Sequence, residues 1–163
     1  AYSTRVGGGP FTTEIFGPLG DRLRNIGKEY GATTGRPRRC GWLDIVALRH
    51  AVRISGITGL AVTKLDVLTG FETVKICVGY RYGNKILKSV PSSVHVLDRC
   101  RPVYEDMDGW TEDPQGARSV ADLPSNMRRY LRRVETLTGV KVILASIGPE
   151  RDQAVLLKNP FTK

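Results

Sequence analysis

The sequence has few cysteines, no cysteine pair and no long apolar run. Cys40, Cys77 and Cys100 lie far apart, and none belongs to a C-x-x-C motif. We therefore expect no zinc or other metal site within the chain, and the odd number of cysteines argues against a disulfide framework. A reducing, cytoplasmic location is the simplest expectation. Because no apolar run could span a bilayer, we also expect no membrane partner.

The sequence does not begin with Met and contains no internal repeats. No apolar stretch follows residues 1–5, so we expect no secretory signal. A start without Met leads us to expect a fragment or a processed chain. Since neither repeats nor low-complexity segments divide the sequence, we expect residues 1–163 to form a single compact unit with no internal boundary.

The composition is that of a globular chain with an excess of positive charge. Hydrophobic residues make up 40% and charged residues 25%, which is ordinary for a domain that buries a core. The net charge of +9 favours anionic partners. Nucleotide phosphates and nucleic acid both fit that charge, and so does a basic surface without a partner.

Apolar spacing predicts a layered α/β fold in which helices and strands alternate along the chain. Glycine-rich residues 1–17 and the segment 91–122 are expected to be connections, the second with short strands. The expected helices cover about 18–29, 43–55 and 125–138, ended by Gly31, Gly56 and Gly139, and the expected strands cover 59–63, 73–80, 140–146 and 153–157, with a hairpin turn at 82–85.

The polar loop 31–39 is the first candidate binding segment. It combines two threonines, a flexible glycine and three arginines within nine residues. Guanidinium groups grip carboxylates and phosphates with two parallel hydrogen bonds, and hydroxyls complete an anion site. A solvated basic loop is the alternative interpretation.

A second candidate is Thr63-Lys64-Leu65-Asp66, directly after an apolar strand. The Asp66 carboxylate could accept hydrogen bonds from guanine N1–H and its exocyclic amine. Adenine presents an acceptor at N1 instead, and the unpaired contact would cost about 1–3 kcal/mol. The Lys64 stem could lie along the purine ring. The alternative is an ordinary pair between this Lys and this Asp.

A third candidate, Ser146-Ile147-Gly148-Pro149, follows another strand. Ligands in open α/β sheets bind at the carboxyl ends of strands, where small residues admit a base or a ribose. An ordinary turn is the alternative interpretation.

The helix expected over 125–138 carries a basic face opposite its apolar stripe. Arg128, Arg129, Arg132 and Arg133 share that face. They could contact the phosphates of a nucleic acid. A solvated helix face is the simpler interpretation, because no aromatic residues are interleaved for base stacking.

These segments occur in the same order in the adenylosuccinate synthetases, and the chain resembles that family over nearly its whole length. The matching motifs are Thr4-Arg5-Val6-Gly7-x-Gly9-Pro10-Phe11-x-Thr13-Glu14, Gly31-Ala32-Thr33-Thr34-Gly35-Arg36-x-Arg38-Arg39, Gly41-Trp42-Leu43-Asp44, Thr63-Lys64-Leu65-Asp66-Val67-Leu68, Tyr104-Glu105, Gly109-Trp110 and Gly148-Pro149.

The resemblance implies a function for the parent enzyme. It would form adenylosuccinate from IMP and L-aspartate, with GTP converted to GDP and phosphate, in AMP biosynthesis. The chain would be the C-terminal portion of a larger, mostly parallel-sheet, P-loop-type ligase that depends on GTP.

The resemblance also implies roles for particular residues. Val6, Gly7 and Arg36 would contact IMP. Ala32, Thr33, Thr34, Gly35, Arg36 and Arg38 would form the aspartate loop, and Arg36 and Arg38 would stabilise the charge of phosphoryl transfer. The GTP contacts would be Arg38, Lys64, Leu65, Asp66, Ser146, Ile147 and Gly148.

Several parts of the family's machinery are expected outside this chain. The sequence contains no G-x-x-x-x-G-K-[ST] motif to cradle phosphates. The resemblance places the phosphate loop, the acid and base residues and the Mg²⁺ ligands in the N-terminal portion, and implies a homodimer. We therefore expect the chain alone to keep its fold and to be inactive. A basic nucleic-acid-binding module is the alternative function, but we expect no nucleic-acid partner.

Overall fold

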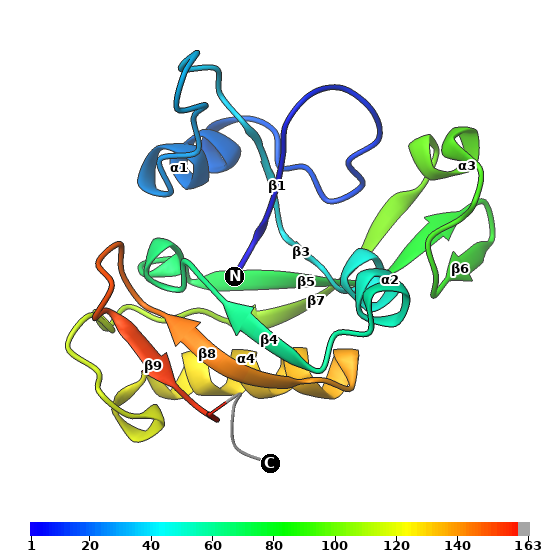
Figure 1. The fold of residues 1–163 in the computed structure, drawn as a ribbon. Coiled ribbons are helices and arrows are strands. Elements are labelled where there is room, and N and C mark those ends of the chain that lie inside the picture. The colour runs from blue at the N-terminus through cyan, green and yellow to red at the C-terminus, as the bar shows by residue number, and fades with distance from the viewer. Residues whose placement is uncertain (160–163) are drawn as a thin grey trace. The chain divides into compact units, whose positions relative to one another are not determined.

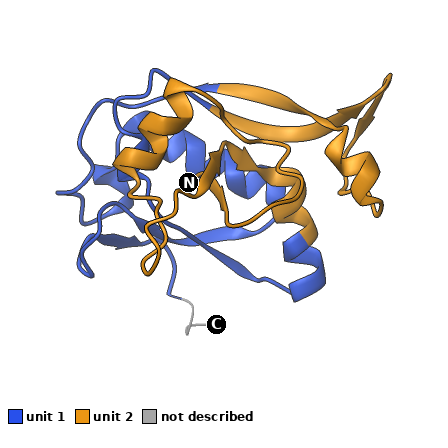
Figure 2. Ribbon diagram, turned by 90° about the horizontal axis from the view of Figure 1, so that it is seen from above, with its two compact units in different colours: residues 1, 51–74, 107–163 blue, residues 2–50, 75–106 orange. Residues whose placement is uncertain are grey.

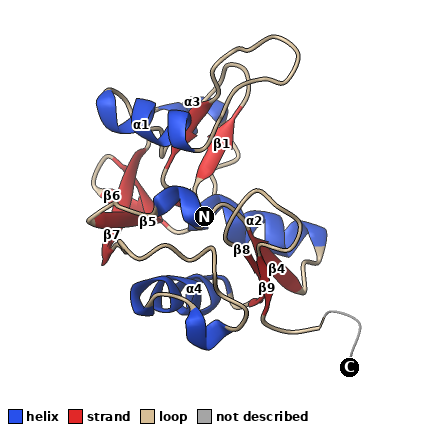
Figure 3. Cartoon of the chain, turned by 90° about the vertical axis from the view of Figure 1, so that its left-hand side faces the viewer, coloured by secondary structure: helices blue, strands red, loops and turns tan. Residues whose placement is uncertain are grey.

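The computed structural model describes residues 1–159, in which helices and strands are interleaved along the chain (Figures 1 and 3). The elements are β1 (Ser3–Arg5), α1 (Pro18–Ile26), β2 (Arg39–Gly41), β3 (Leu43–Asp44), α2 (Ile45–Ser55), β4 (Gly59–Val62), the 3-10 helix η1 (Asp66–Leu68), β5 (Thr73–Tyr82), β6 (Lys85–Leu87), α3 (Val94–Asp98), β7 (Arg101–Asp108), the 3-10 helix η2 (Val120–Asp122), α4 (Ser125–Thr138), β8 (Lys141–Ser146) and β9 (Ala154–Leu156).

The residues group into two compact units, coloured separately in Figure 2. Unit 1 contains Ala1, residues 51–74 and the chain from 107 onward. Unit 2 contains residues 2–50 and 75–106. The unit boundaries fall inside α2, β5 and β7, so the same three elements contribute residues to both units. The expectation of one folding unit without an internal boundary stays a prediction.

Unit 1 is built on a sheet with the strand order β4-β8-β9. β4 and β8 are parallel, and β9 returns antiparallel to β8. Helix α4 packs on β8 through its apolar stripe, in which Met127, Leu131 and Val134 are buried. Gly139 ends the helix in the left-handed conformation, with a φ of 74°, which glycine adopts without a steric penalty. The helix predicted over 125–138 is confirmed.

Unit 2 combines parallel and antiparallel pairs. β3 runs parallel to β5, β6 forms an antiparallel hairpin with β5, and β7 also pairs with β5. β1 and β2 form a separate antiparallel pair with Arg5 opposite Arg39. The predicted α/β class is confirmed, and the sheets of the described chain mix the two strand directions. The hairpin turn predicted at 82–85 is confirmed by the pairing of Tyr82 with Lys85.

Two predicted helices have different ends in the structure. α1 stops at Ile26 with Gly27 as its cap, rather than at Gly31. Lys28 has a φ of 50°, so the chain has left the right-handed helix before Gly31 is reached. α2 begins at Ile45 rather than Leu43, because Leu43 and Asp44 pair with β5.

The segments expected to be connections contain further regular structure. Strand β1 lies in the glycine-rich start, and both α3 and the eight-residue strand β7 lie within 91–122. In β7 the charged residues at 101, 105, 106 and 108 leave no clear apolar alternation. This strand depends on its pairing with β5, a long-range interaction that local propensity does not report.

A buried carboxylate joins three elements of unit 2. Asp44 is only 9% exposed; its carboxylate accepts hydrogen bonds from the Tyr80 hydroxyl at 2.6 Å and from the Ala47 amide at 3.0 Å. The second bond caps the start of α2. Burial raises the pKa of Asp44 above its ordinary value, and the Tyr80 hydrogen bond partly opposes that rise.

Tyr80→Phe should destabilise the chain by about 2 kcal/mol at neutral pH and by less in acid. Without the hydroxyl, the pKa of Asp44 rises further, because the Tyr80 hydrogen bond is the strongest interaction that opposes the effect of burial. A carboxyl whose pKa is raised by folding stabilises the fold while protonated, and that stability is lost as the pH rises through the folded pKa. The deficit of the variant should therefore grow from acid to neutral pH.

Urea unfolding at several pH values measures this change. Tyr82→Phe is the matched control, because the Tyr82 hydroxyl makes no hydrogen bond within the described residues. A Tyr80→Phe deficit that is the same at every pH would show that the hydroxyl does not act through Asp44.

Candidate functional site

A cavity of about 440 Å³ in unit 2 gathers most residues of the predicted anion site. Its lining residues are Arg5, Val6, Gly7, Gly31, Thr34, Arg36, Pro37, Arg38 and Arg39. Pairing of β1 with β2 brings residues 5–7 beside the end of the arginine loop, although some 30 residues separate them in sequence. The segments that sequence reasoning assigned to two ligands thus share one cavity. Ala32, Thr33 and Gly35 lie in the same loop outside the lining.

The backbone fixes both ends of the arginine loop. The Gly31 amide donates to the Arg36 carbonyl at 2.8 Å, and the Gly35 amide donates to the Gly31 carbonyl at 2.8 Å. Gly35 has a φ of 63°, a conformation that explains a glycine at this turn. Beyond the turn, the Arg38 amide donates to the Glu29 carbonyl at 2.9 Å. The loop therefore closes on itself and presents its arginines from a fixed base.

Arg38 is held by a carboxylate that sequence reasoning missed. Its Nη1 donates to Glu29 Oε2 at 3.1 Å, and the Tyr2 hydroxyl donates to Glu29 Oε1 at 2.6 Å. Glu29 is only 2% exposed, whereas the Arg38 side chain is 38% exposed. The buried Arg38 Nε has no hydrogen-bond partner within the described residues. Glu29 thus orients a guanidinium that still has donors to offer to a ligand.

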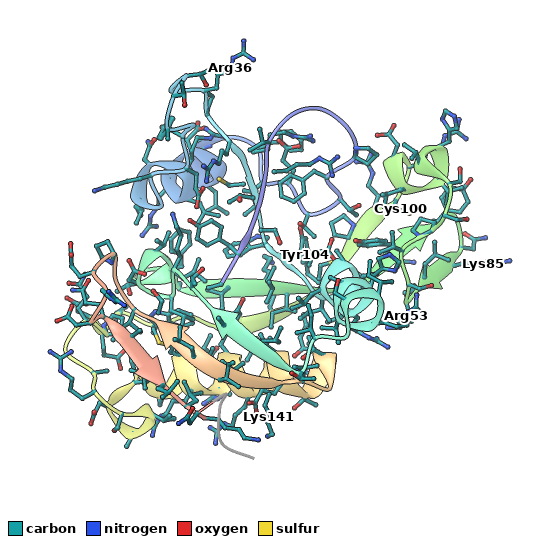
Figure 4. The ribbon with its side chains drawn as sticks, in the orientation of Figure 1. Arg36, Arg53, Lys85, Cys100, Tyr104 and Lys141 are labelled. Carbon is teal, nitrogen blue, oxygen red and sulfur yellow. The ribbon has the colours of Figure 1, made fainter. Side chains whose placement is uncertain are left out.

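Arg36 differs from Arg38 in having no internal partner. Its side chain makes no hydrogen bond or ion pair within residues 1–159 and points away from the ribbon (Figure 4). An arginine without an internal carboxylate keeps its full bidentate capacity for an external anion. The Arg36 side chain is therefore held by no internal partner, whereas the Arg38 side chain is oriented by Glu29.

The second predicted cluster lies in unit 1, where β4 and β8 end. These strands are parallel, with Val62 beside Ala145, so the segments that follow them emerge at the same edge of the sheet. The Leu65 amide donates to the Ser146 carbonyl at 3.2 Å and joins the two segments directly. The structure therefore brings together residues 64–66 and 146–148, which the family resemblance assigns to one nucleotide.

Within this cluster, two charged side chains lie beside the strand ends. Lys64 has a φ of 61°, which is uncommon for a residue with a Cβ. Asp66 begins the 3-10 helix η1 and is half-buried, and its carboxylate makes no hydrogen bond within the described residues. A half-buried carboxylate with open acceptor positions can receive the two donors of a guanine edge.

Other residues of the cluster support it rather than offering side chains. Leu65 and Ile147 are fully buried in the core, so a ligand could meet only their backbone. Gly148 lies against Gln153, whose Oε1 would be 2.2 Å from a Cβ at position 148. The same Oε1 accepts the Glu150 amide at 3.0 Å, which fixes the turn after β8. Sequence reasoning did not identify Gln153.

The described residues contain no group of three or more His, Cys, Asp or Glu side chains that could hold a metal ion. The same part of the chain has no helix both long and apolar enough to cross a membrane.

The basic face of α4 is only partly available to a partner. Arg129 pairs with Asp108 at 3.1 Å. Arg128 and Arg132 lie beside Leu131 in a cavity of about 400 Å³ that is largely apolar. The expectation that this face binds no nucleic acid stays a prediction, which salt-dependent DNA binding would contradict.

The fold is mixed α/β, with an arginine-lined cavity in unit 2 and a carboxylate at the strand ends of unit 1. These features define a class of α/β proteins that bind anionic nucleotides. Comparison with known proteins narrows this class. A model of the family "Adenylosuccinate synthetase" matches residues 1–155, so the chain belongs to the adenylosuccinate synthetase family.

Similar proteins agree with this assignment in sequence and in structure. The chain is 63% identical over 163 residues to the adenylosuccinate synthetase of Syntrophus aciditrophicus and 59% identical over 161 residues to that of Moorella thermoacetica; each comparison covers 99% of this chain and 38% of the relative. A solved structure of the fully ligated enzyme from Plasmodium falciparum superimposes with a TM-score of 0.92 at 38% identity, covering 96% of this chain and 38% of the other. The chain therefore spans well under half the length of these relatives.

Proposed function

We propose that the chain is the C-terminal portion of an adenylosuccinate synthetase and supplies its aspartate loop, part of its IMP site and its guanine pocket. The observation that carries this proposal is the cavity shared by Val6, Gly7, Thr34, Arg36 and Arg38. Family membership supports the assignment. The C-terminal placement rests on the motifs, and it requires that the additional length of the relatives precede the matched segment.

The parent enzyme would be a GTP-dependent carbon–nitrogen ligase of AMP biosynthesis. GTP would transfer its γ-phosphoryl group to O6 of IMP, and the amine of L-aspartate would then attack C6 and displace phosphate. The net products are adenylosuccinate, GDP and phosphate. Cytoplasmic location and assembly as a homodimer belong to the same proposal.

The arginines of the cavity suit the charges of this reaction. L-Aspartate carries two carboxylates, and guanidinium groups bind carboxylates through two parallel bonds. Arg36, which has no internal partner, would grip aspartate and approach IMP. Arg38, oriented by Glu29, would contact aspartate on the side nearer GTP. Both would stabilise the negative charge that develops during phosphoryl transfer.

Unit 1 would recognise the guanine base of GTP. The Asp66 carboxylate would accept N1–H and the exocyclic amine, and the Lys64 stem would cover the ring. The backbone of 146–148 would complete the pocket, which the hydrogen bond between Leu65 and Ser146 holds together. Adenine cannot satisfy Asp66, because its N1 is an acceptor.

The remaining chemistry would come from outside this chain. Mg²⁺ would neutralise phosphate charge in the parent enzyme, but the described residues provide no ligand cluster for it. The sequence also contains no phosphate-cradling P-loop motif. We therefore propose that the chain alone forms no adenylosuccinate, and detectable product from the isolated chain would contradict this.

Calorimetric titration of the chain with GDP and ADP tests the guanine pocket. The two ligands carry the same phosphates, so a difference between them reports the base. We expect GDP to bind about 10-fold or more tightly than ADP, since the unmatched edge costs about 1–3 kcal/mol. Equal affinities, or no binding of either at millimolar concentration, would contradict a complete base pocket within this chain.

A further inference from the structure

Arg39 is the most extensively bonded arginine of the cavity, and its partners lie inside the protein. Its Nε donates to both Glu14 oxygens at 3.0 Å, and its Nη2 donates to Glu14 Oε2 at 2.5 Å. On the other side, Nη1 donates to the Gly9 carbonyl at 2.7 Å and to the Gly7 carbonyl at 3.3 Å. The guanidinium thus bridges a carboxylate and a glycine-rich backbone.

Glu14 is itself fixed in the fold. Its backbone forms a bridge with Gly41, the last residue of the strand β2 that Arg39 begins, and its amide donates to the Phe11 carbonyl at 3.1 Å. Its side chain is only 12% exposed. The Arg39 guanidinium also lies 5.5 Å from the centre of the Phe11 ring. The hydrogen bonds to the Glu14 carboxylate raise the pKa of Arg39, so the guanidinium keeps its charge.

The segment that Arg39 holds has little rigidity of its own. Gly7 and Gly9 have φ values of 81° and 98°, which glycine adopts readily. Glycine also loses more conformational entropy than other residues when a segment becomes ordered. Val6, beside them, is 79% exposed and has no core packing to fix it. Besides Arg39, the Arg5 guanidinium reaches the Gly8 carbonyl at 3.2 Å. Side-chain bonds to carbonyls therefore set the path of this loop.

Arg38, just before β2, and Arg39, its first residue, have different hydrogen-bond partners. Arg38, which lines the cavity, bonds Glu29, and its buried Nε has no hydrogen-bond partner within the described residues. The Nε and Nη2 atoms of Arg39 bond Glu14, and its Nη1 atom bonds the glycine carbonyls. Its donors are committed to the protein, so its role lies in placing other groups rather than in gripping a ligand.

We propose that Arg39, anchored by Glu14, is a positioning residue that fixes the Gly7–Gly9 backbone against the arginine loop and so shapes both walls of one anion cavity. This inference deepens the proposed function, because it concerns the same IMP and aspartate site. Without the clamp, the glycine segment must be ordered when the ligand binds, and binding is weakened by that conformational entropy.

Arg39→Lys and Glu14→Gln test the clamp in the intact chain. Lysine keeps the charge but cannot bond a carboxylate and two carbonyls in one planar fork. Hydrogen exchange at the amides of residues 7–9 should become about tenfold faster in either variant, because local opening is no longer resisted. If Arg39 and Glu14 act only through each other, exchange at residues 7–9 should be little faster in the double variant than in either single variant.

Arg101→Lys is the matched control, since Arg101 is exposed in the same unit and has no partner within the described residues. Unchanged exchange at 7–9 in Arg39→Lys would overturn the proposal. So would acceleration spread evenly over the chain, including the amides of β8, because that pattern reports global destabilisation.

Calorimetry with IMP adds the functional measurement. Arg39→Lys should bind IMP about tenfold more weakly than the wild type, in line with the exchange result. If the variant binds IMP as tightly as the wild type, the clamp does not position the site. If the wild type itself binds no IMP, the proposed IMP site fails within this chain, and the exchange data still decide whether the clamp exists.

Discussion

Gly109→Ala is expected to lower the free energy of unfolding by about 3 kcal/mol, among the largest effects of adding a single methyl group. A Cβ at this position would lie 1.7 Å from the Phe71 carbonyl oxygen. The backbone cannot move away easily, because the Gly109 amide donates to the Glu72 carbonyl at 2.8 Å and its carbonyl accepts Asn126 Nδ2 at 2.7 Å. The fully buried Trp110 follows at once.

Gly116→Ala provides the matched control for this measurement. A Cβ at 116 would meet no atom within 4 Å, and Gly116 does not have a positive φ. The same substitution should there be neutral or slightly stabilising, because it reduces the freedom of the unfolded chain. Urea denaturation gives the free energies of unfolding of both variants for comparison. Equal unfolding free energies would contradict the close packing of Gly109 on Phe71.

Asp66→Asn should abolish the preference for GDP and create a preference for xanthosine diphosphate. The asparagine oxygen can accept N1–H, but its amide would place a donor opposite the exocyclic amine of guanine. Xanthine has a carbonyl oxygen in place of that amine and accepts from the amide instead. We expect GDP affinity to fall about 10- to 100-fold, since an unmatched buried contact costs about 1–3 kcal/mol.

Calorimetry with GDP, ADP and xanthosine diphosphate measures this exchange of specificity. Asp98→Asn is the control, because it makes the same change of charge at an exposed position of the other unit. A loss of GDP binding without gain of xanthosine diphosphate would weaken the assigned contact. Unchanged GDP binding in Asp66→Asn would show that this carboxylate does not bind the guanine base.

The sequence predicted the elements whose evidence is local. Helix α4 has apolar residues at helical spacing and a glycine at its end, and the structure places it at the predicted residues. The β5–β6 hairpin follows from the alternation of its first strand and the Gly-Asn turn. In both cases neighbours within about a dozen residues decide the conformation.

The elements that sequence reasoning missed depend on distant partners. β3 is only two residues long and exists because Leu43 pairs with Ile76. In the segment 91–122, where only short strands were expected, β7 extends over eight residues, carries charges on much of its length and pairs with β5. Short periodicity cannot report such pairing, since the stabilising contacts come from residues far away in the chain.

The candidate site divides in the same way. The arginine loop and the strand-end Asp66 were predictable from residue type and position. The bonds that orient the arginines were not, because Glu29 and Glu14 lie elsewhere in the sequence and Tyr2 acts on Arg38 only through Glu29. A buried glutamate has no pattern of its own in a single sequence.

The most direct test of the proposed function replaces the matching segment of the Syntrophus aciditrophicus enzyme, 63% identical over 163 residues, with this chain. The purified hybrid is assayed for adenylosuccinate formation from IMP, L-aspartate and GTP, with the Asp66→Asn hybrid beside it. We predict product formation with GTP, and a shift toward xanthosine triphosphate in the variant. A folded hybrid that forms no adenylosuccinate, although the unaltered relative does, would contradict the proposal that this chain supplies the aspartate loop and the guanine pocket.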